Sequence, residues 1–224
     1  MAGGGHIISE SEDDIVRWNI GQTVGSYILP WGIGAATYLP MSFSTLNNAV
    51  GVNGFMDFAT YRTPTWRNSD YLPAGVLHVG GLGDAPGLDI SNYVIDRFWL
   101  MRMSNFTTKP SLNTVQFNYQ DIEHSVASNT IIESDLVAQR YNDIIDDWGP
   151  VYFGAANTAL NFVSAPTIAN NQIYDWWTLA MSIFPLPIEL LYFTGFPVED
   201  QVKLVWETST EINNDYFVIE RSRD

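Results

Sequence analysis

The residues that could carry nucleophilic or metal chemistry are sparse in this sequence. Its 224 residues include no cysteine and three histidines, His6, His78 and His124. The chain has no Gly-x-Ser-x-Gly nucleophile motif, and no His-x-His or His-Glu-x-x-His spacing that would favour zinc. A lone histidine next to a glutamate, as in Glu123-His124, is more typical of a hydrogen-bonded structural residue than of a catalytic base. These patterns predict a protein that is not an enzyme.

Carboxylates are abundant, because Asp and Glu together number 25. A glycoside hydrolase needs two carboxylates at a set separation, and the densest clusters are residues 10–14 and 143–147. Both clusters fall between expected strands, so solvated acidic turns are the favoured interpretation and a hydrolase is the least favoured function. The segment from Asp84 to Asp89 offers oxygen ligands for a structural Ca²⁺, but it lacks the regular spacing of a calcium loop. We therefore assign no metal site and no cofactor.

Aromatic side chains are the third source of chemistry. Trp31, Tyr61, Trp66 and Tyr71 flank turns or a long loop, where exposed rings could stack on the apolar face of a sugar. The competing interpretation is that these rings are part of the core. Core packing is expected for the tryptophans that fall within strands, namely Trp18, Trp99, Trp148, Trp176, Trp177 and Trp206.

Strands must position these side chains, because two-residue alternation dominates the sequence and helical periodicity is nearly absent. Leu39, Met41 and Phe43, for example, lie on one face of a single strand. Arg97 and Arg102 are expected near the solvent side or the ends of another strand. The expected strands are separated by Gly, Pro and Asn turns, and they span residues 15–20, 24–29, 38–44, 54–61, 94–103, 112–119, 137–142, 147–153, 159–163 and 176–183. Such a series predicts an all-β fold, an antiparallel β-sandwich of jelly-roll or immunoglobulin-like type.

The segment 61–92 interrupts this pattern with three prolines, five glycines and little alternation. Loops of this length in compact domains are usually functional or disordered. Trp66 and Tyr71 lie in it, which is why they are the leading candidates for a sugar-stacking surface.

A second boundary is marked by Pro185 and Pro187, which favour extended backbone and interrupt a strand ladder. We expect a β-sandwich domain at residues 1–184, a Pro-rich linker at 185–187 and a truncated module at 188–224. Its expected strands, 188–193, 201–208 and 216–221, are fewer than a fibronectin-III-type sandwich needs. An exposed edge could pair with another copy of the chain by strand addition, or dock on the first domain. The edge candidates are apolar, namely Leu190, Phe193, Leu204, Trp206, Phe217 and Ile219.

The formal net charge of −15 disfavours nucleic acids and anionic membrane surfaces as partners. No apolar run approaches the roughly 18 residues of a membrane-spanning helix, so membrane insertion is not expected. The first residues do not have the pattern of a signal peptide, so any export signal is expected outside this sequence.

The C-terminal segments 186–193, 202–208 and 211–222 are similar to the β-sandwich module (LPVELL…W.T..E.NN..F.VERS) of Bacteroidetes cell-surface proteins. In that family the module precedes a C-terminal sorting domain recognised by the type IX secretion system. The upstream part resembles the companion module of such proteins more loosely, over roughly residues 7–182, through 24–32, 38–41, 95–99, 108–110 and 137–142. The resemblance implies an extracellular or cell-surface protein with a fibronectin-III-like C-terminal module and no catalytic residues to carry over.

Together these observations favour a non-enzymatic structural or adhesive module of an exported bacterial surface protein. The alternative is a carbohydrate-binding module that holds a polysaccharide on Trp66, Tyr71 and neighbouring groups. Self-association through the C-terminal strands is the expected protein–protein contact.

Overall fold

The computed structural model describes residues 5–34, 37–46, 49–80, 89–149, 154–182, 190–199 and 201–208. The chain divides into two compact units, residues 1–182 and 183–224. The all-β prediction is confirmed, since the described helical segments are short 3-10 turns and none could cross a lipid bilayer. These turns are η1 (Asn68–Tyr71), η2 (Ser91–Tyr93), η3 (Asp121–Glu123), η4 (Glu133–Asp135) and η5 (Asn170–Gln172).

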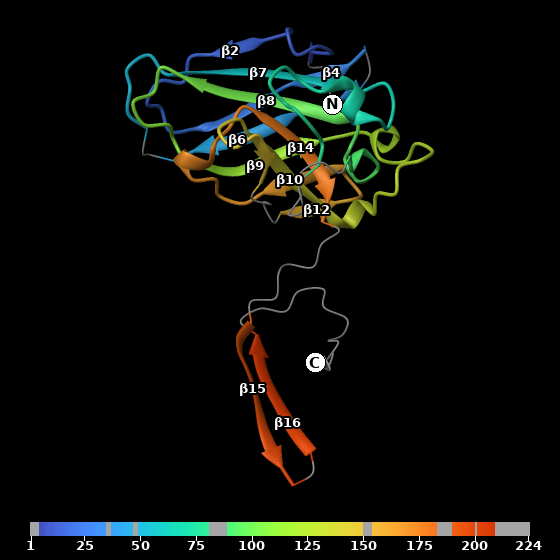
Figure 1. The fold of residues 1–224 in the computed structure, drawn as a ribbon. Helices are drawn as coiled ribbons and strands as arrows, with labels where there is room; N and C mark the ends of the chain where they lie inside the picture. The colour runs from blue at the N-terminus through green and yellow to red at the C-terminus, as the bar shows by residue number, and fades with distance from the viewer. Residues whose placement is uncertain are drawn as a thin grey trace. The chain divides into compact units, whose positions relative to one another are not determined.

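The first unit is a sandwich of two antiparallel sheets (Figure 1). The six-stranded sheet has the spatial order β11 (Asp147–Trp148), β10 (Leu136–Asn142), β14 (Trp176–Met181), β8 (Arg97–Ser104), β7 (Phe55–Arg62) and β2 (Val16–Trp18). The five-stranded sheet has the order β12 (Ala155–Asn157), β13 (Phe162–Ala165), β9 (Leu112–Asn118), β6 (Met41–Thr45) and β3 (Ser26–Leu29). A small third sheet, with one parallel pair, joins β1 (Ile7–Ile8), β4 (Trp31–Ile33) and β5 (Thr37–Tyr38).

The main core lies between the two large sheets and follows the alternation in the sequence. In β6, Met41 and Phe43 are buried while Ser42 and Ser44 are only half-buried. The largest side chains of this core stack on one another, and Phe117 contacts both Trp99 and Trp177 with ring centroids 5.2 and 5.6 Å apart. Burial of this apolar surface supplies most of the stability of the sandwich.

The outer face of the six-stranded sheet carries a second apolar cluster. Ala59, Phe98, Leu100, Tyr141, Trp148 and Trp176 form it together with Val76 and Val79. The last two residues belong to the long segment expected to be a functional or disordered loop. Its described part, 61–80, instead packs against the sheet, because alternating strands such as β7 present apolar side chains on both faces.

Beside β7 and β8 lies a group of charged and polar side chains that we call the buried polar cluster: Thr60, Asp96, Arg97, Glu123 and Asn129. Arg97 was expected near the solvent side or at the end of its strand: it is the first residue of β8, but its side chain is buried and not near solvent. Its side chain is 2% exposed and that of Glu123 is 0% exposed, and Arg97 Nη2 lies 2.6 Å from Glu123 Oε1. Arg97 Nη1 also donates to Thr60 Oγ1 at 3.1 Å. A buried guanidinium is tolerated here because a carboxylate and a hydroxyl satisfy its donors.

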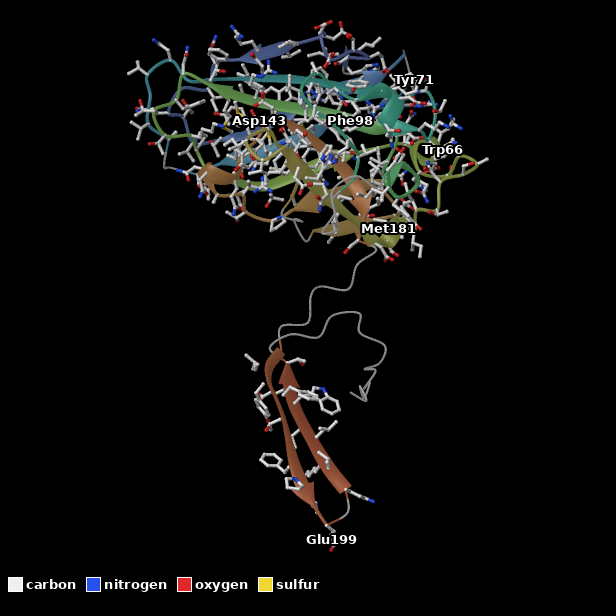
Figure 2. The ribbon with its side chains drawn as sticks, viewed as in Figure 1. Trp66, Tyr71, Phe98, Asp143, Met181 and Glu199 are labelled. Carbon is white, nitrogen blue, oxygen red and sulfur yellow. The ribbon has the colours of Figure 1, made fainter. Side chains whose placement is uncertain are left out.

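The second unit contains an antiparallel hairpin of β15 (Leu190–Val198) and β16 (Gln201–Thr208). Glu199, labelled in Figure 2, lies at its turn and has a positive φ of 52°. The strand expected at residues 188–193 extends further than predicted, because β15 continues to Val198. A proline is compatible with it because each strand of a two-stranded sheet has a free edge. The expected linker 185–187 and third strand 216–221 lie outside the described residues.

Candidate functional site

An open groove of about 510 Å³ lies on the sandwich, within the size range of small-molecule sites. It is bordered by three parts of the chain, namely β5 with the residue after it, the end of β9 with the start of η3, and the turn between β12 and β13. The residues that line it are Thr37, Tyr38, Leu39, Asn118, Tyr119, Gln120, Asp121, Thr158, Ala159, Leu160 and Asn161. Most of them are polar and uncharged.

Tyr38 is the exposed aromatic residue of this groove, with 53% of its surface accessible. Its position is fixed because β5 pairs with β4, where Tyr38 lies opposite Gly32. The next residue, Leu39, is buried and its amide donates to the Trp31 carbonyl at 2.8 Å. Gly32 leaves no room for a side chain, because a Cβ there would lie 2.5 Å from the Thr37 carbonyl oxygen. The backbone at Tyr38 is therefore held by its pairing with β4.

The turn between β12 and β13 forms another wall. Residues 159–163 were expected to be a strand, but residues 158–161 form a turn. Asn157 Oδ1 accepts hydrogen bonds from the amides of Ala159 and Leu160 at 3.2 and 3.1 Å. Asn161 then adopts a positive φ of 51°, a conformation that asparagine tolerates better than most residues. Asparagine side chains thus override the apparent strand pattern and make a fixed turn.

The third wall is η3, which is separated from the end of β9 by two residues. The amide of Glu123 donates to the Gln120 carbonyl at 2.9 Å, and the amide of Gln120 donates to Glu123 Oε2 at 3.1 Å. Asp121 points to solvent with its side chain 80% exposed, and its Oδ1 accepts a hydrogen bond from Asn161 Nδ2. This bond connects the η3 wall to the turn wall. Glu123 anchors the same turn to the interior through Arg97.

This arrangement suits the binding of a neutral, hydroxyl-rich molecule. Tyr38 and Leu160, which is 66% exposed, supply apolar surface. The side chains of Asn118 and Thr158 make no hydrogen bond with other described residues, so their donors and acceptors are available to a ligand. Amide and hydroxyl groups both donate and accept, which matches the mixed requirement of sugar hydroxyls. The lining residues place no histidine, and no second carboxylate, that could act with Asp121 as an acid–base pair.

Of the aromatic residues expected to stack on a sugar, Trp31 is buried, so the prediction is wrong for it, and Tyr61 is half-buried. Trp31 is 1% exposed, because its side chain packs in the main core. Tyr61 packs against Phe98 and Trp176 with ring centroids 5.7 and 6.2 Å away. Burial raises the pKa of the Tyr61 hydroxyl, which donates to the carbonyl of Tyr71 at 2.8 Å.

Trp66 and Tyr71 keep some exposure, and Figure 2 shows them toward one end of the sandwich. Tyr71 is 40% exposed at the end of η1, and Trp66 is half-buried with the Arg67 guanidinium 5.5 Å from its ring. Neither residue lines the groove at Tyr38. They remain a second, separate candidate surface.

The histidines are engaged in local structure. His6 Nε2 contacts the Gly34 carbonyl, and the two ring nitrogens of His78 contact the carbonyls of Gly80 and Asp146. The ring of His124 packs edge-on against Tyr119, with its Nε2 3.8 Å from Glu133 Oε1 and 4.0 Å from Asp121 Oδ1. Burial, together with a hydrogen bond to Glu133, raises the pKa of Tyr119. His124 therefore lies behind the η3 wall of the groove.

The acidic clusters noted in the sequence form local turns. Asp14 Oδ2 accepts from the amide of Glu10 at 3.1 Å, and burial raises the pKa of Glu10. Asp143 and Asp146 are exposed in the turn after β10. Among the described residues, no group of three or more histidine or acidic side chains could hold a metal ion. Of the proposed calcium ligands, Asp84 lies outside the described residues.

Asp89, the other end of that proposed calcium segment, has its oxygens engaged by hydroxyl groups. Ser91 Oγ and Ser69 Oγ donate to the Asp89 carboxylate at 2.6 and 2.7 Å. Burial by itself would raise the pKa of Asp89, but these hydrogen bonds lower it overall. The carboxylate thus ties η1 to η2.

Asp96 is a buried carboxylate that the sequence analysis missed. The residue is 2% exposed, and its Oδ1, like Oδ1 of Asn129, has no hydrogen-bond partner among the described residues. Burial raises the pKa of Asp96 to about 6. Its position directly before Arg97 in an apolar strand was the available signal.

Comparison with known proteins gives no relative, because no family model, curated protein or solved structure matches the chain. The function is therefore inferred from the residues and their geometry.

Proposed function

We propose that this chain is a non-catalytic adhesive module that binds neutral glycans in the groove beside Tyr38, as part of an exported bacterial surface protein. The observation that carries the binding part is the groove itself, in which one exposed tyrosine faces a border of amide and hydroxyl side chains. Stacking on the ring would contribute affinity, and the polar border would fix the orientation of the sugar.

The walls of the groove are preorganised, which supports a binding role. β5 is held by Gly32 and Leu39, while the turn wall and η3 are joined through Asn161 and Asp121. A site that is already ordered loses less conformational entropy when a ligand binds.

The proposal of export rests on the resemblance of segments 186–193, 202–208 and 211–222 to Bacteroidetes surface proteins secreted by the type IX system. Weak, repeated glycan contacts are useful to an adhesin because many copies on one surface add through avidity. A module with a single stacking ring fits that role.

The test is a glycan array followed by isothermal titration of the strongest neutral oligosaccharide. We expect Tyr38→Ala to weaken binding about tenfold, corresponding to about 1.4 kcal/mol. Tyr71→Ala and Trp66→Ala are matched controls, since they remove partly exposed aromatic rings outside the groove. If either control weakens binding while Tyr38→Ala does not, the site belongs to the loop and the groove assignment is wrong.

A second candidate function, self-association, is favoured by the hairpin. The register places Phe193, Pro197, Val202, Leu204 and Trp206 on one face of β15–β16, and Phe193 is 54% exposed. Among the described residues, exposed apolar side chains on this face such as Phe193 and Val202 favour a covering partner. Of the other proposed edge residues, Leu190 begins β15, while Phe217 and Ile219 lie outside the described residues. Light scattering would detect this as a mass that is a multiple of 25.1 kDa.

A further inference from the structure

The charge of the groove is unbalanced. Asp121 is the one charged residue among those that line it, and no lysine or arginine is among them. Its carboxylate is 80% exposed, and its described partners are the neutral amide of Asn161 and the ring of His124, whose Nε2 is 4.0 Å away. A ligand in the groove would therefore meet a negative charge without a compensating cation.

We infer that Asp121 makes this groove selective against acidic glycans, so that it accepts neutral chains and rejects those bearing uronate, sulfate or sialate groups; this inference rests on the proposed function. The carboxylate can accept hydrogen bonds from sugar hydroxyls, which are donors, but it repels a second anion at the same distance. The remaining lining groups, such as Asn118 and Thr158, offer no charge that would offset the repulsion.

The overall net charge of −15 is a competing source of the same selectivity. The two sources differ in range. The general surface charge repels an anionic glycan from the whole molecule, whereas a carboxylate in the groove repels only an anionic group on the sugar bound there. Replacing a single acid at two different positions separates them. Asp143 is a suitable comparison, since it lies on the exposed turn after β10 and does not line the groove.

The experiment compares neutral polysaccharides (laminarin, xylan, mannan and dextran) with their carboxymethyl derivatives, which carry the same backbone and added carboxylates. Binding is measured at low salt and at pH 8, above the range in which histidines usually titrate. We expect the intact chain to bind a neutral polysaccharide about tenfold more tightly than its carboxymethyl form. Asp121→Asn should remove most of this ratio, whereas Asp143→Asn should leave it unchanged.

Each outcome decides a different question. If no neutral polysaccharide binds, the proposed function and this inference both fail. If neutral and carboxymethyl forms bind equally well, glycan binding stands and the inference fails. If Asp121→Asn and Asp143→Asn change the ratio equally, or if neither changes it, the selectivity does not come from Asp121. Because the readout is a ratio of affinities for one protein, a change in overall binding by the variant does not imitate the expected result.

Discussion

Asp121 and Glu123 stand two residues apart on one short 3-10 turn, and they belong to two regions with opposite properties. Asp121 faces the groove with its side chain 80% exposed, and its carboxylate contacts a neutral amide. Glu123 is fully buried in the polar cluster, where it is held by Arg97 and by the amide of Gln120. The same turn thus leaves one carboxylate exposed to solvent and uses the other to fix itself to the sandwich. This difference shows that the environment, and not the residue type, separates an accessible carboxylate from a structural one.

The largest effect should follow from breaking the buried pair. Glu123→Gln leaves the Arg97 guanidinium buried without its counter-charge, so we expect it to lower the free energy of unfolding by about 3–5 kcal/mol. Urea unfolding followed by tryptophan fluorescence measures this loss. A loss below about 1 kcal/mol would mean that water reaches Arg97, and the two regions would then be less different than the structure indicates.

The next largest effect is expected from Asp96→Asn, which should raise the free energy of unfolding at neutral pH, whereas Glu123→Gln lowers it. Burial raises the pKa of Asp96 to about 6 from the ordinary value of 3.8, so the native state favours the protonated acid. Its contribution to stability is therefore greatest below pH 4 and is lost as the pH rises toward 6 and above. Asp96→Asn should remove the cost of ionising a buried carboxylate, and it should therefore raise the free energy of unfolding at pH 7.5 by about 1–3 kcal/mol. At pH 4, where the native acid is protonated, the gain should be small.

Thermal unfolding of the intact protein and of Asp96→Asn from pH 4 to pH 8 checks this prediction. The quantity to compare is the difference in stability between the two proteins, because other carboxylates titrate in the same range and their contributions cancel in that difference. A difference that does not change with pH would show that Asp96 is ionised at no cost. The buried polar cluster would then tolerate a charged carboxylate as well as the solvent-exposed groove does.

Part of this architecture could be predicted from the sequence, because alternation reports which side chains face a core. The pattern in 38–44 placed Leu39, Met41 and Phe43 on one face, and all three are buried. The same alternation could not assign Arg97, since its burial depends on a partner 26 positions away that periodicity does not reveal. Charged residues break the expected pattern wherever an ion pair satisfies them.

The groove was harder to predict than the fold. Alternation places Tyr38 on the face opposite Leu39, Met41 and Phe43, but nothing in its neighbourhood indicates that residues 118–121 and 158–161 lie beside it. Asn157 and Asn161 interrupt a segment that otherwise resembles a strand, and side-chain hydrogen bonds decide its conformation. For Trp31 the error was the opposite one: its neighbours Pro30 and Gly32 suggested a turn at the surface, but the residue is buried.

A smaller effect is expected in the turn wall of the groove. Asn161→Ala and Asn161→Gly both delete the amide that donates to Asp121, but only alanine pays the steric cost of the positive φ of 51°. Glycine should be the more stable of the two variants by about 0.5–1 kcal/mol, after allowing for its greater freedom in the unfolded chain. Chemical denaturation of the pair measures the difference. Equal stabilities would indicate that the turn relaxes in solution and that the wall is less ordered than proposed.

The smallest effect on stability should come from Asp121→Asn, which makes the same chemical change on the same turn as Glu123→Gln. An exposed carboxylate loses little on neutralisation, so we expect the unfolding free energy to change by no more than about 0.5 kcal/mol. The nearby His124 Nε2, 4.0 Å away, would add attraction only when the imidazole is charged, so the measurement is made at pH 8. If Asp121→Asn destabilised the protein as much as Glu123→Gln, then Asp121 would be part of the structural framework, and the contrast between the two carboxylates of η3 would fail.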